Sequence, residues 1–92
     1  MLFMITQVHA AESCPIEAGG SSVLYNPKAK GAKLQAMYGA FPQHTIWYVV
    51  EADSVEAVQE FLTPGFLRCT STVTPISSVP MVRREIYFPK ES

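Results

Sequence analysis

The alternation of apolar and polar residues predicts four strands and one further extended piece near the end of the chain. Apolar and β-branched residues dominate residues 2–9, 32–41, 44–52 and 68–76, and a similar alternation returns at 81–88. The third of these segments, HTIWYVVEA, is the strongest, because Ile, Trp, Tyr and Val all favour strands. The first carries few polar residues, which is typical of a strand covered on both faces. The pattern therefore predicts a four-stranded sheet.

One helix is predicted between the third and fourth strands. Asp53 is the expected N-cap, and Glu56 stands at the third helical position, where it can reach back to the cap. Pro64 and Gly65 end the helix. The apolar residues between these signals recur at helical spacing, as in an amphipathic helix: Val55, Val58, Phe61 and Leu62.

The segment between the first two strands carries weaker helical signals. Pro15 suits the first position of a helix, and Glu17 follows Cys14 by three residues, as in a capping box. Gly19-Gly20 and Asn26-Pro27 then interrupt the periodicity. We therefore expect one or two short helical pieces within residues 15–31, which amounts to a shortened first helix.

These elements together give an α+β chain of order βαββαβ, which is the ferredoxin-like arrangement. We predict one domain over residues 1–92, an antiparallel sheet of strand order 4-1-3-2, and a C-terminal tail at 79–92 that adds an extra strand. In this topology the end of the first strand meets the starts of the third and fourth strands. The chain's two histidines and two cysteines are therefore expected at one end of the sheet: His9, Cys14, His44 and Cys69.

Composition excludes several classes of protein. The net charge is −1, and Lys and Arg form no cluster beyond Arg83-Arg84, so there is no basic face for a nucleic acid. No apolar stretch approaches the roughly 18 residues of a transmembrane helix. The apolar N-terminal segment lacks the charged region of a signal peptide, since the first basic residue is Lys28. These features predict a cytoplasmic protein that does not bind membranes.

The same composition favours self-association. The chain is 48% hydrophobic and only 16% charged, so one sheet face is expected to carry more apolar surface than a thin helical layer covers. We predict a homodimer that buries this face. The extended piece at Met81–Phe88, which follows Pro80, is expected to pair with the sheet edge of the partner subunit.

Imidazole and thiolate groups are the usual ligands of zinc, iron and copper, which makes His9, Cys14 and His44 a candidate metal site. Their spacing matches no zinc-finger or metalloprotease motif, so the hypothesis depends on the predicted convergence. The alternative is that the histidines are solvated at strand ends and the cysteines are buried as small apolar residues.

Aromatic residues of the second and third strands suggest a pocket for a small apolar ligand. Tyr38 and Tyr48 share the parity of His44 within this hairpin, so the three are expected to face one cavity. Aromatic side chains at such positions also fill cores and dimer interfaces, and that alternative stays open.

Four segments make the chain resemble the dimeric α/β-barrel superfamily: MLFMITQVH, HTIWYVVEADS, SVEAVQEFL and CTSTVTPI. The closest likeness is to small uncharacterised bacterial and archaeal proteins whose third strand enters its helix through a sequence like VVEADSVEAVQEFL. Muconolactone isomerases and antibiotic-biosynthesis-type monooxygenases are more distantly similar. The resemblance implies two ferredoxin-like subunits packed sheet against sheet into a barrel. The interrupted first helix departs from this pattern.

Two functions follow as hypotheses. The first is binding of a metal ion or small ligand at the edge formed by His9, Cys14 and His44. The alternative is a cofactor-independent monooxygenase or isomerase that acts on a small apolar or aromatic substrate, with His44 or His9 as acid or base. A purely structural or interaction module is the third class. No catalytic motif in the sequence decides whether the protein is an enzyme.

Overall fold

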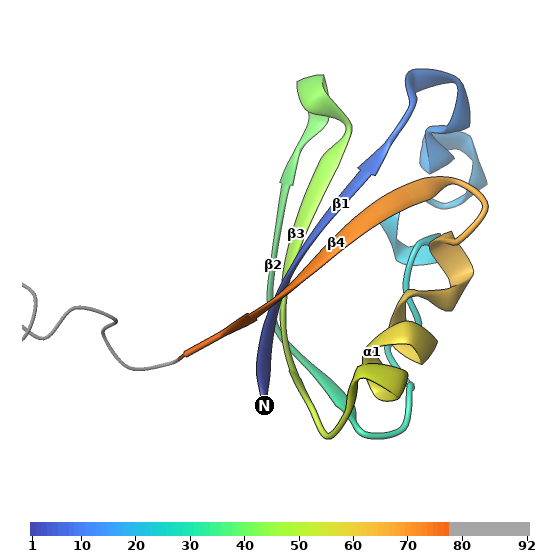
Figure 1. The fold of residues 1–92 in the computed structure, drawn as a ribbon. Helices are drawn as coiled ribbons and strands as arrows, with labels where there is room; N and C mark the ends of the chain where they lie inside the picture. Colours follow the sequence, from blue (N-terminus) through green and yellow to red (C-terminus); the bar gives the residue numbers. More distant parts are fainter. Residues whose placement is uncertain (78–92) are drawn as a thin grey trace, which may run out of the picture.

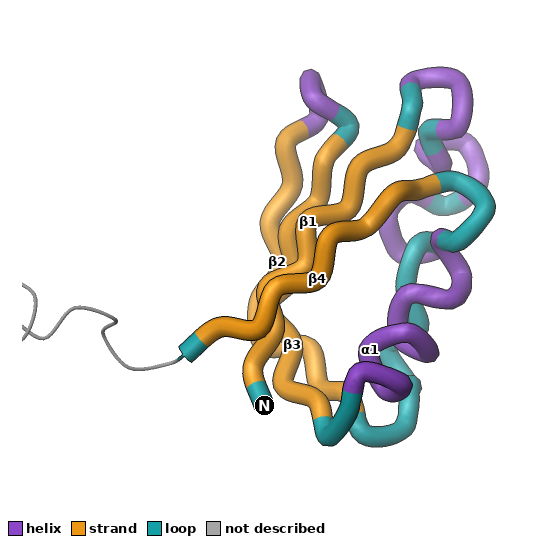
Figure 2. Tube along the Cα trace, viewed as in Figure 1, coloured by secondary structure: helices purple, strands orange, loops and turns teal. Residues whose placement is uncertain are grey.

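The computed structural model describes residues 1–77, which form an antiparallel sheet with helical segments on one face (Figures 1 and 2). The regular elements are β1 (Leu2–His9), β2 (Ala32–Ala40), β3 (Thr45–Ala52), α1 (Val55–Leu62) and β4 (Cys69–Ile76). This confirms the predicted α+β class with its four strands. The tail at 79–92, with its predicted strand at 81–88, lies outside the described residues.

The sheet has the strand order β2-β3-β1-β4, which reads 4-1-3-2 from the β4 edge. Every neighbouring pair is antiparallel. Strand β1 lies inside the sheet, and its last residues pair with the first residues of both neighbours: Val8 with Thr45, and His9 with Cys69. The end of β1 therefore meets the starts of β3 and β4, where the sequence placed the candidate site.

The short helical pieces predicted within residues 15–31 are present, but they are 3-10 helices, and no α-helix forms between β1 and β2. Three short 3-10 helices take its place: η1 (Ala11–Ser13), η2 (Pro15–Ala18) and η3 (Gly20–Val23). Gly19 and Gly20 have φ angles of 116° and 78°, a left-handed conformation that ends one helical turn before another begins. The two glycines therefore divide the segment into single turns.

Helix α1 begins one residue later than the sequence predicted. Its N-cap is Ser54, whose hydroxyl oxygen accepts a hydrogen bond from the Ala57 N–H at 3.2 Å. Asp53 lies in the turn after β3 instead, and its N–H donates to the Gly31 carbonyl at 2.8 Å. The buried stripe consists of Ala57, Val58, Phe61 and Leu62, while the predicted member Val55 is exposed.

The core lies between α1 and the inner face of the sheet, which is the face that the helical segments cover in Figure 1. Alternate residues of β1 and β3 point inward and are almost completely buried, as the two-residue period of a strand requires. These residues pack against α1 and against the segment before β2. The largest fully buried apolar side chains of the resulting core are Ile5, Leu24, Tyr48, Val50, Val58 and Phe61.

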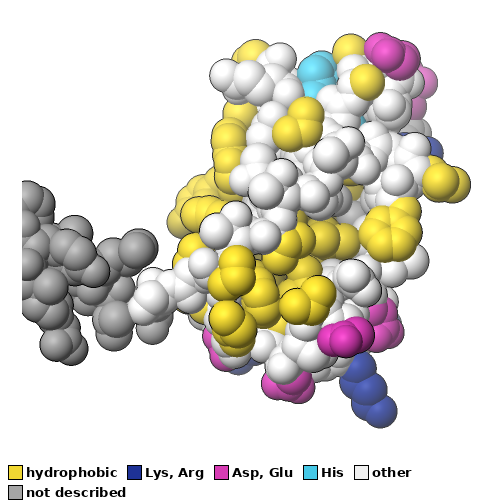
Figure 3. Space-filling view, viewed as in Figure 1, with side chains coloured by type: hydrophobic (Ala, Val, Ile, Leu, Met, Phe, Trp, Pro, Cys, Tyr) yellow, Lys and Arg dark blue, Asp and Glu magenta, His cyan; other side chains and the backbone are white. Residues whose placement is uncertain are grey.

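No helix covers the outer face of the sheet within residues 1–77. Met4, Trp47 and Val49 are partly exposed there, and Val8 is 43% exposed. Figure 3 shows apolar side chains spread over the strands, with charged side chains mainly towards the two ends of the molecule. The homodimer that would bury this face stays a prediction. No helix in the described part of the chain has the length and apolar character needed to cross a membrane.

Candidate metal centre

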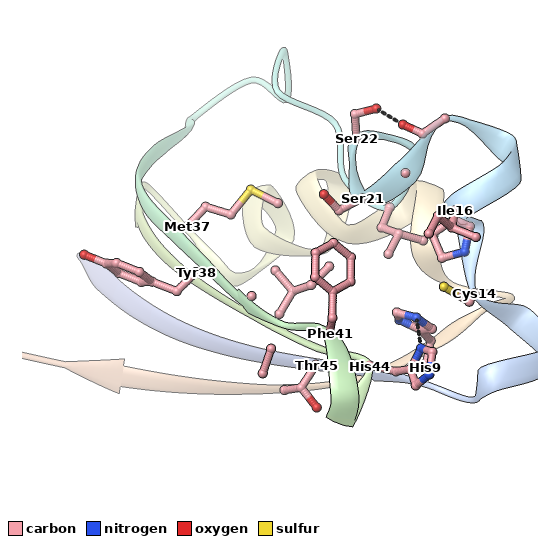
Figure 4. A pocket seen from close by; sticks show the side chains of 17 residues that line it. His9, Cys14, Ile16, Ser21, Ser22, Met37, Tyr38, Phe41, His44 and Thr45 are labelled. Atoms are coloured by element: carbon pink, nitrogen blue, oxygen red, sulfur yellow. Dashed lines mark hydrogen bonds between the residues drawn. The ribbon is translucent and has the colours of Figure 1, made fainter.

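Three elements bring His9, Cys14 and His44 together at one end of the sheet (Figure 4). His9 is the last residue of β1, Cys14 lies between η1 and η2, and His44 follows the turn η4 (Phe41–Gln43) that joins β2 to β3. One ligand atom from each of the three side chains lies within 4.8 Å of the other two. The predicted convergence of these residues is therefore confirmed.

The backbone at His44 fixes this arrangement. Its φ and ψ angles of 47° and 46° lie in the left-handed region, which is uncommon for a residue other than glycine. Its N–H donates to the Phe41 carbonyl at 3.0 Å, which closes the turn, and its carbonyl accepts from the His9 N–H at 3.1 Å. The second bond ties the hairpin to the end of β1, so both imidazoles are attached to one hydrogen-bonded frame.

The two imidazoles contact each other directly. His44 Nδ1 and His9 Nε2 are 3.2 Å apart, and the ring planes meet at 77° in an edge-to-face arrangement. A single proton shared between these nitrogens makes a hydrogen bond at this distance. Two nitrogens bonded to one tetrahedral metal ion at about 2.0 Å are also about 3.3 Å apart, by simple trigonometry. The same separation therefore serves either a shared proton or a shared metal ion.

His9 is only 8% exposed, and its Nδ1 is buried without a hydrogen-bond partner among the described residues. Unpartnered buried polar atoms are rare and often mark the place of an ion or a functional group. Burial lowers the pKa of His9 from its usual value of 6.5, and the nearby charge of His44 adds to this effect. The neutral imidazole is thereby favoured, and it is the form that binds metal ions.

The two cysteines differ in position. Both are free thiols, but only Cys14 belongs to the cluster. Cys69 pairs with His9 across the sheet, as its predicted place at the same edge requires, yet it is not among the three convergent ligands. Burial raises the pKa of Cys69, and neighbouring Arg68 only partly opposes this. A thiol held protonated in this way is a poor metal ligand, because the thiolate is the binding form.

A cavity of about 560 Å³ opens beside the cluster, and His9, Cys14 and His44 all line it. The rest of its wall comes mainly from β2, from the start of β3 and from the 3-10 segments, and includes Ile16, Ser21, Leu24, Met37, Gly39, Phe41 and Ile46. None of the lining residues is Asp, Glu, Lys or Arg. The strand pattern did not reveal this wall, because half of it belongs to the irregular segment that the glycines interrupt.

The three residues predicted to face one ligand pocket, Tyr38, His44 and Tyr48, do not face a common cavity in the structure. His44 and Tyr38 line the cavity, although the Tyr38 ring is 66% exposed and points away from the cluster (Figure 4). Tyr48 is not part of the cavity wall and lies in the core. The register explains the difference, because Tyr38 pairs with Trp47 and Tyr48 pairs with Met37. Tyr38 and Tyr48 therefore lie on opposite faces of the sheet.

Tyr48 instead supports the segment that carries Cys14. Its hydroxyl donates to Gln7 Oε1 at 2.7 Å, and Gln7 Nε2 donates to the Leu24 carbonyl at 3.2 Å. Gln7 is completely buried, so these bonds satisfy groups that water cannot reach. No sequence pattern indicated this role, since glutamine is mostly found exposed to solvent. The chain of bonds fastens the segment before β2 to the sheet.

The chain was compared with protein families, with curated proteins and with solved structures. No family model, no curated protein and no solved structure matches it. The resemblance to the dimeric α/β-barrel superfamily therefore stays a prediction, and the function has to be argued from the site itself.

Proposed function

We propose that the protein binds a transition-metal ion, namely zinc, iron or copper, through His9, Cys14 and His44. The observation that supports this most directly is the mutual distance of their ligand atoms, within 4.8 Å. Two imidazoles and one thiolate are a donor set that these ions accept. The 3.2 Å between His9 Nε2 and His44 Nδ1 is a second argument, because it matches the separation of two nitrogens that bind one tetrahedral ion.

A metal ion on His9 Nε2 would replace the proton shared with His44 Nδ1, so that both imidazoles bind the same ion. The protein then supplies three ligands with Cys14, and a fourth position is left for water or a small molecule from the cavity. This is the pattern of metal sites that act on or hold a ligand, since structural zinc sites are closed by four protein ligands.

The test uses Co²⁺ as a spectroscopic substitute, added to the untagged, metal-free chain. Cobalt bound to a thiolate gives an intense sulfur-to-metal charge-transfer absorption, which identifies the cysteine ligand. We expect one equivalent to bind, and we expect Cys14→Ser to remove the charge-transfer band. Affinity should fall by more than the roughly 10–100-fold that follows loss of an outer-shell partner.

The chain offers a matched control in Cys69→Ser, which removes the other thiol of the described region, next to the cluster but outside it. This variant should keep both the band and the affinity. His9→Gln and His44→Gln should each weaken binding. The proposal fails if a folded chain binds no metal ion, or if Cys69→Ser rather than Cys14→Ser removes the band.

The cavity gives some support to the alternative predicted from sequence, a cofactor-independent monooxygenase or isomerase. A substrate in this space would lie against both imidazoles, which are candidate acids or bases. The two functions differ in their need for metal. If a purified chain that contains no metal turns over a small aromatic substrate, and chelators leave the rate unchanged, the alternative holds and the metal proposal does not.

A further inference from the structure

We propose that the cavity beside the cluster binds a small molecule with an apolar body and a single monoanionic head, the head being the fourth ligand of the metal ion. This inference rests on the proposed metal site. At about 560 Å³ the cavity falls within the roughly 300–1,000 Å³ that small-molecule sites occupy. Because His9, Cys14 and His44 all line it, a ligand in the cavity is within reach of the open position.

The charge of the site determines the head. A divalent ion with one thiolate and two neutral imidazoles carries a net charge of about +1. No acidic or basic side chain is found among the described residues that line the cavity. The remaining positive charge therefore has no counter-ion among the described residues of the wall, and the apolar side chains that line it make such an uncompensated charge costly. One monoanionic donor, such as a carboxylate or a thiolate, neutralises it.

The wall determines the body. Leu24 and Ile46 line the cavity from the core, and Met37 is partly buried beside them. Ile16 and Phe41 also line it, yet their side chains are 67% and 83% exposed, and they come from separate elements, η2 and η4. Large apolar side chains therefore extend from the core to the mouth. An apolar ligand body that contacts them removes this surface from water.

Calorimetry on the zinc-loaded chain tests the head with three probes that share one body: 3-phenylpropanoate, 3-phenylpropan-1-ol and 3-phenylpropylammonium. We expect the carboxylate to bind at least about 10-fold more tightly than the alcohol, which corresponds to about 1.4 kcal/mol, and the ammonium not to bind. This preference should vanish in the metal-free chain. Acetate, which has the head without the body, should bind more weakly than phenylpropanoate if the body lies in the cavity.

Gly39 allows the cavity to be closed without touching a metal ligand. It lines the cavity and pairs with Ile46, so an added side chain would lie on the same inner face, and its Cβ would meet nothing closer than the Thr45 carbonyl oxygen at 4.0 Å. Gly39→Phe should keep the Co²⁺ spectrum of the wild type and bind phenylpropanoate no better than acetate. Gly39→Ala is the matched control, and it should bind as the wild type does.

The outcomes separate the two proposals. The inference is overturned if the metal ion binds normally but the alcohol binds as well as the carboxylate, or if Gly39→Phe leaves the affinity for phenylpropanoate unchanged. Failure of the metal titration itself overturns the proposed function, and with it the anionic head. If Gly39→Phe does not fold, Gly39→Val makes the same comparison with a smaller side chain that suits a strand.

Discussion

The two halves of the inner sheet face are covered in different ways. Under α1, the side chains of Val50, Val58 and Phe61 are at most 1% exposed, and the layer is densely packed. Under the 3-10 segments, the same face borders a cavity of about 560 Å³ and carries His9 Nδ1, which has no hydrogen-bond partner within residues 1–77. The first half stabilises the fold, and the second half contains the candidate metal site.

The difference follows from the shape of the covering segment. An α-helix aligns residues three and four apart into one apolar stripe, so α1 presents a continuous surface to the strands. Single 3-10 turns separated by Gly19 and Gly20 cannot form such a stripe, and the glycines contribute no side chains to fill space. The sheet below them is left incompletely covered, and polar groups gather at its edge.

The largest loss of folding stability is expected for a substitution under α1, in the densely packed half. Phe61→Ala removes a fully buried ring that contacts the rings of Tyr25 and Tyr48, and should lower the free energy of unfolding by about 3–5 kcal/mol. Phe41→Ala, in the open half, removes a ring that is 83% exposed and should change it by less than about 0.5 kcal/mol. Urea denaturation of both metal-free variants measures the difference. Equal losses would contradict the contrast between the halves.

A smaller loss of folding stability is expected at the buried hydrogen bond between Tyr48 and Gln7, where the two halves meet. Tyr48→Phe removes the donor to Gln7 Oε1 and leaves a buried acceptor without a partner, which costs about 1–3 kcal/mol. Tyr25→Phe is the control, because no hydrogen bond of its hydroxyl is found within residues 1–77. Denaturation should rank Tyr48→Phe as the less stable variant. If the two prove equally stable, the buried bond contributes nothing.

In the half under the 3-10 segments, the left-handed backbone of His44 should determine how substitutions of this residue affect stability. His44→Gly and His44→Ala both lose the imidazole, but only alanine keeps the steric cost of a Cβ at a φ of 47°. The glycine variant should therefore be more stable than the alanine variant by about 1 kcal/mol, with neither binding metal tightly. The reverse order in thermal denaturation would argue against the left-handed turn.

His9 makes stability depend on pH. Its pKa is lowered in the folded state, first by burial and then by His44, so the unfolded chain binds the proton more readily. The contribution of His9 is fully present above about pH 6.5, its ordinary pKa, and is lost as the pH falls from there through the folded pKa. Denaturation of the metal-free chain across this range should show the decline, and His9→Gln should reduce its slope. An unchanged slope would mean that His9 titrates normally in the folded protein.

The sequence predicted the strands and the place of the site with good accuracy. Strand β3 and the helix before Pro64 follow from strong local preferences, and the convergence of His9 and His44 follows from antiparallel topology alone. The cap was misplaced by one residue because Asp53 and Ser54 are both good caps, and the local sequence does not decide between them.

Tertiary structure alone decided what surrounds the site. The turn at Phe41–Gln43 sets the register of the adjoining strand residues, and this placed Tyr38 and Tyr48 on opposite faces although their spacing in the sequence suggested one. Burial of Gln7, the lone Nδ1 of His9 and the exclusion of Cys69 from the cluster depend on contacts between distant segments. Local patterns determine which residues form strands, whereas the identity of a residue's neighbours across the sheet depends on how the whole chain packs.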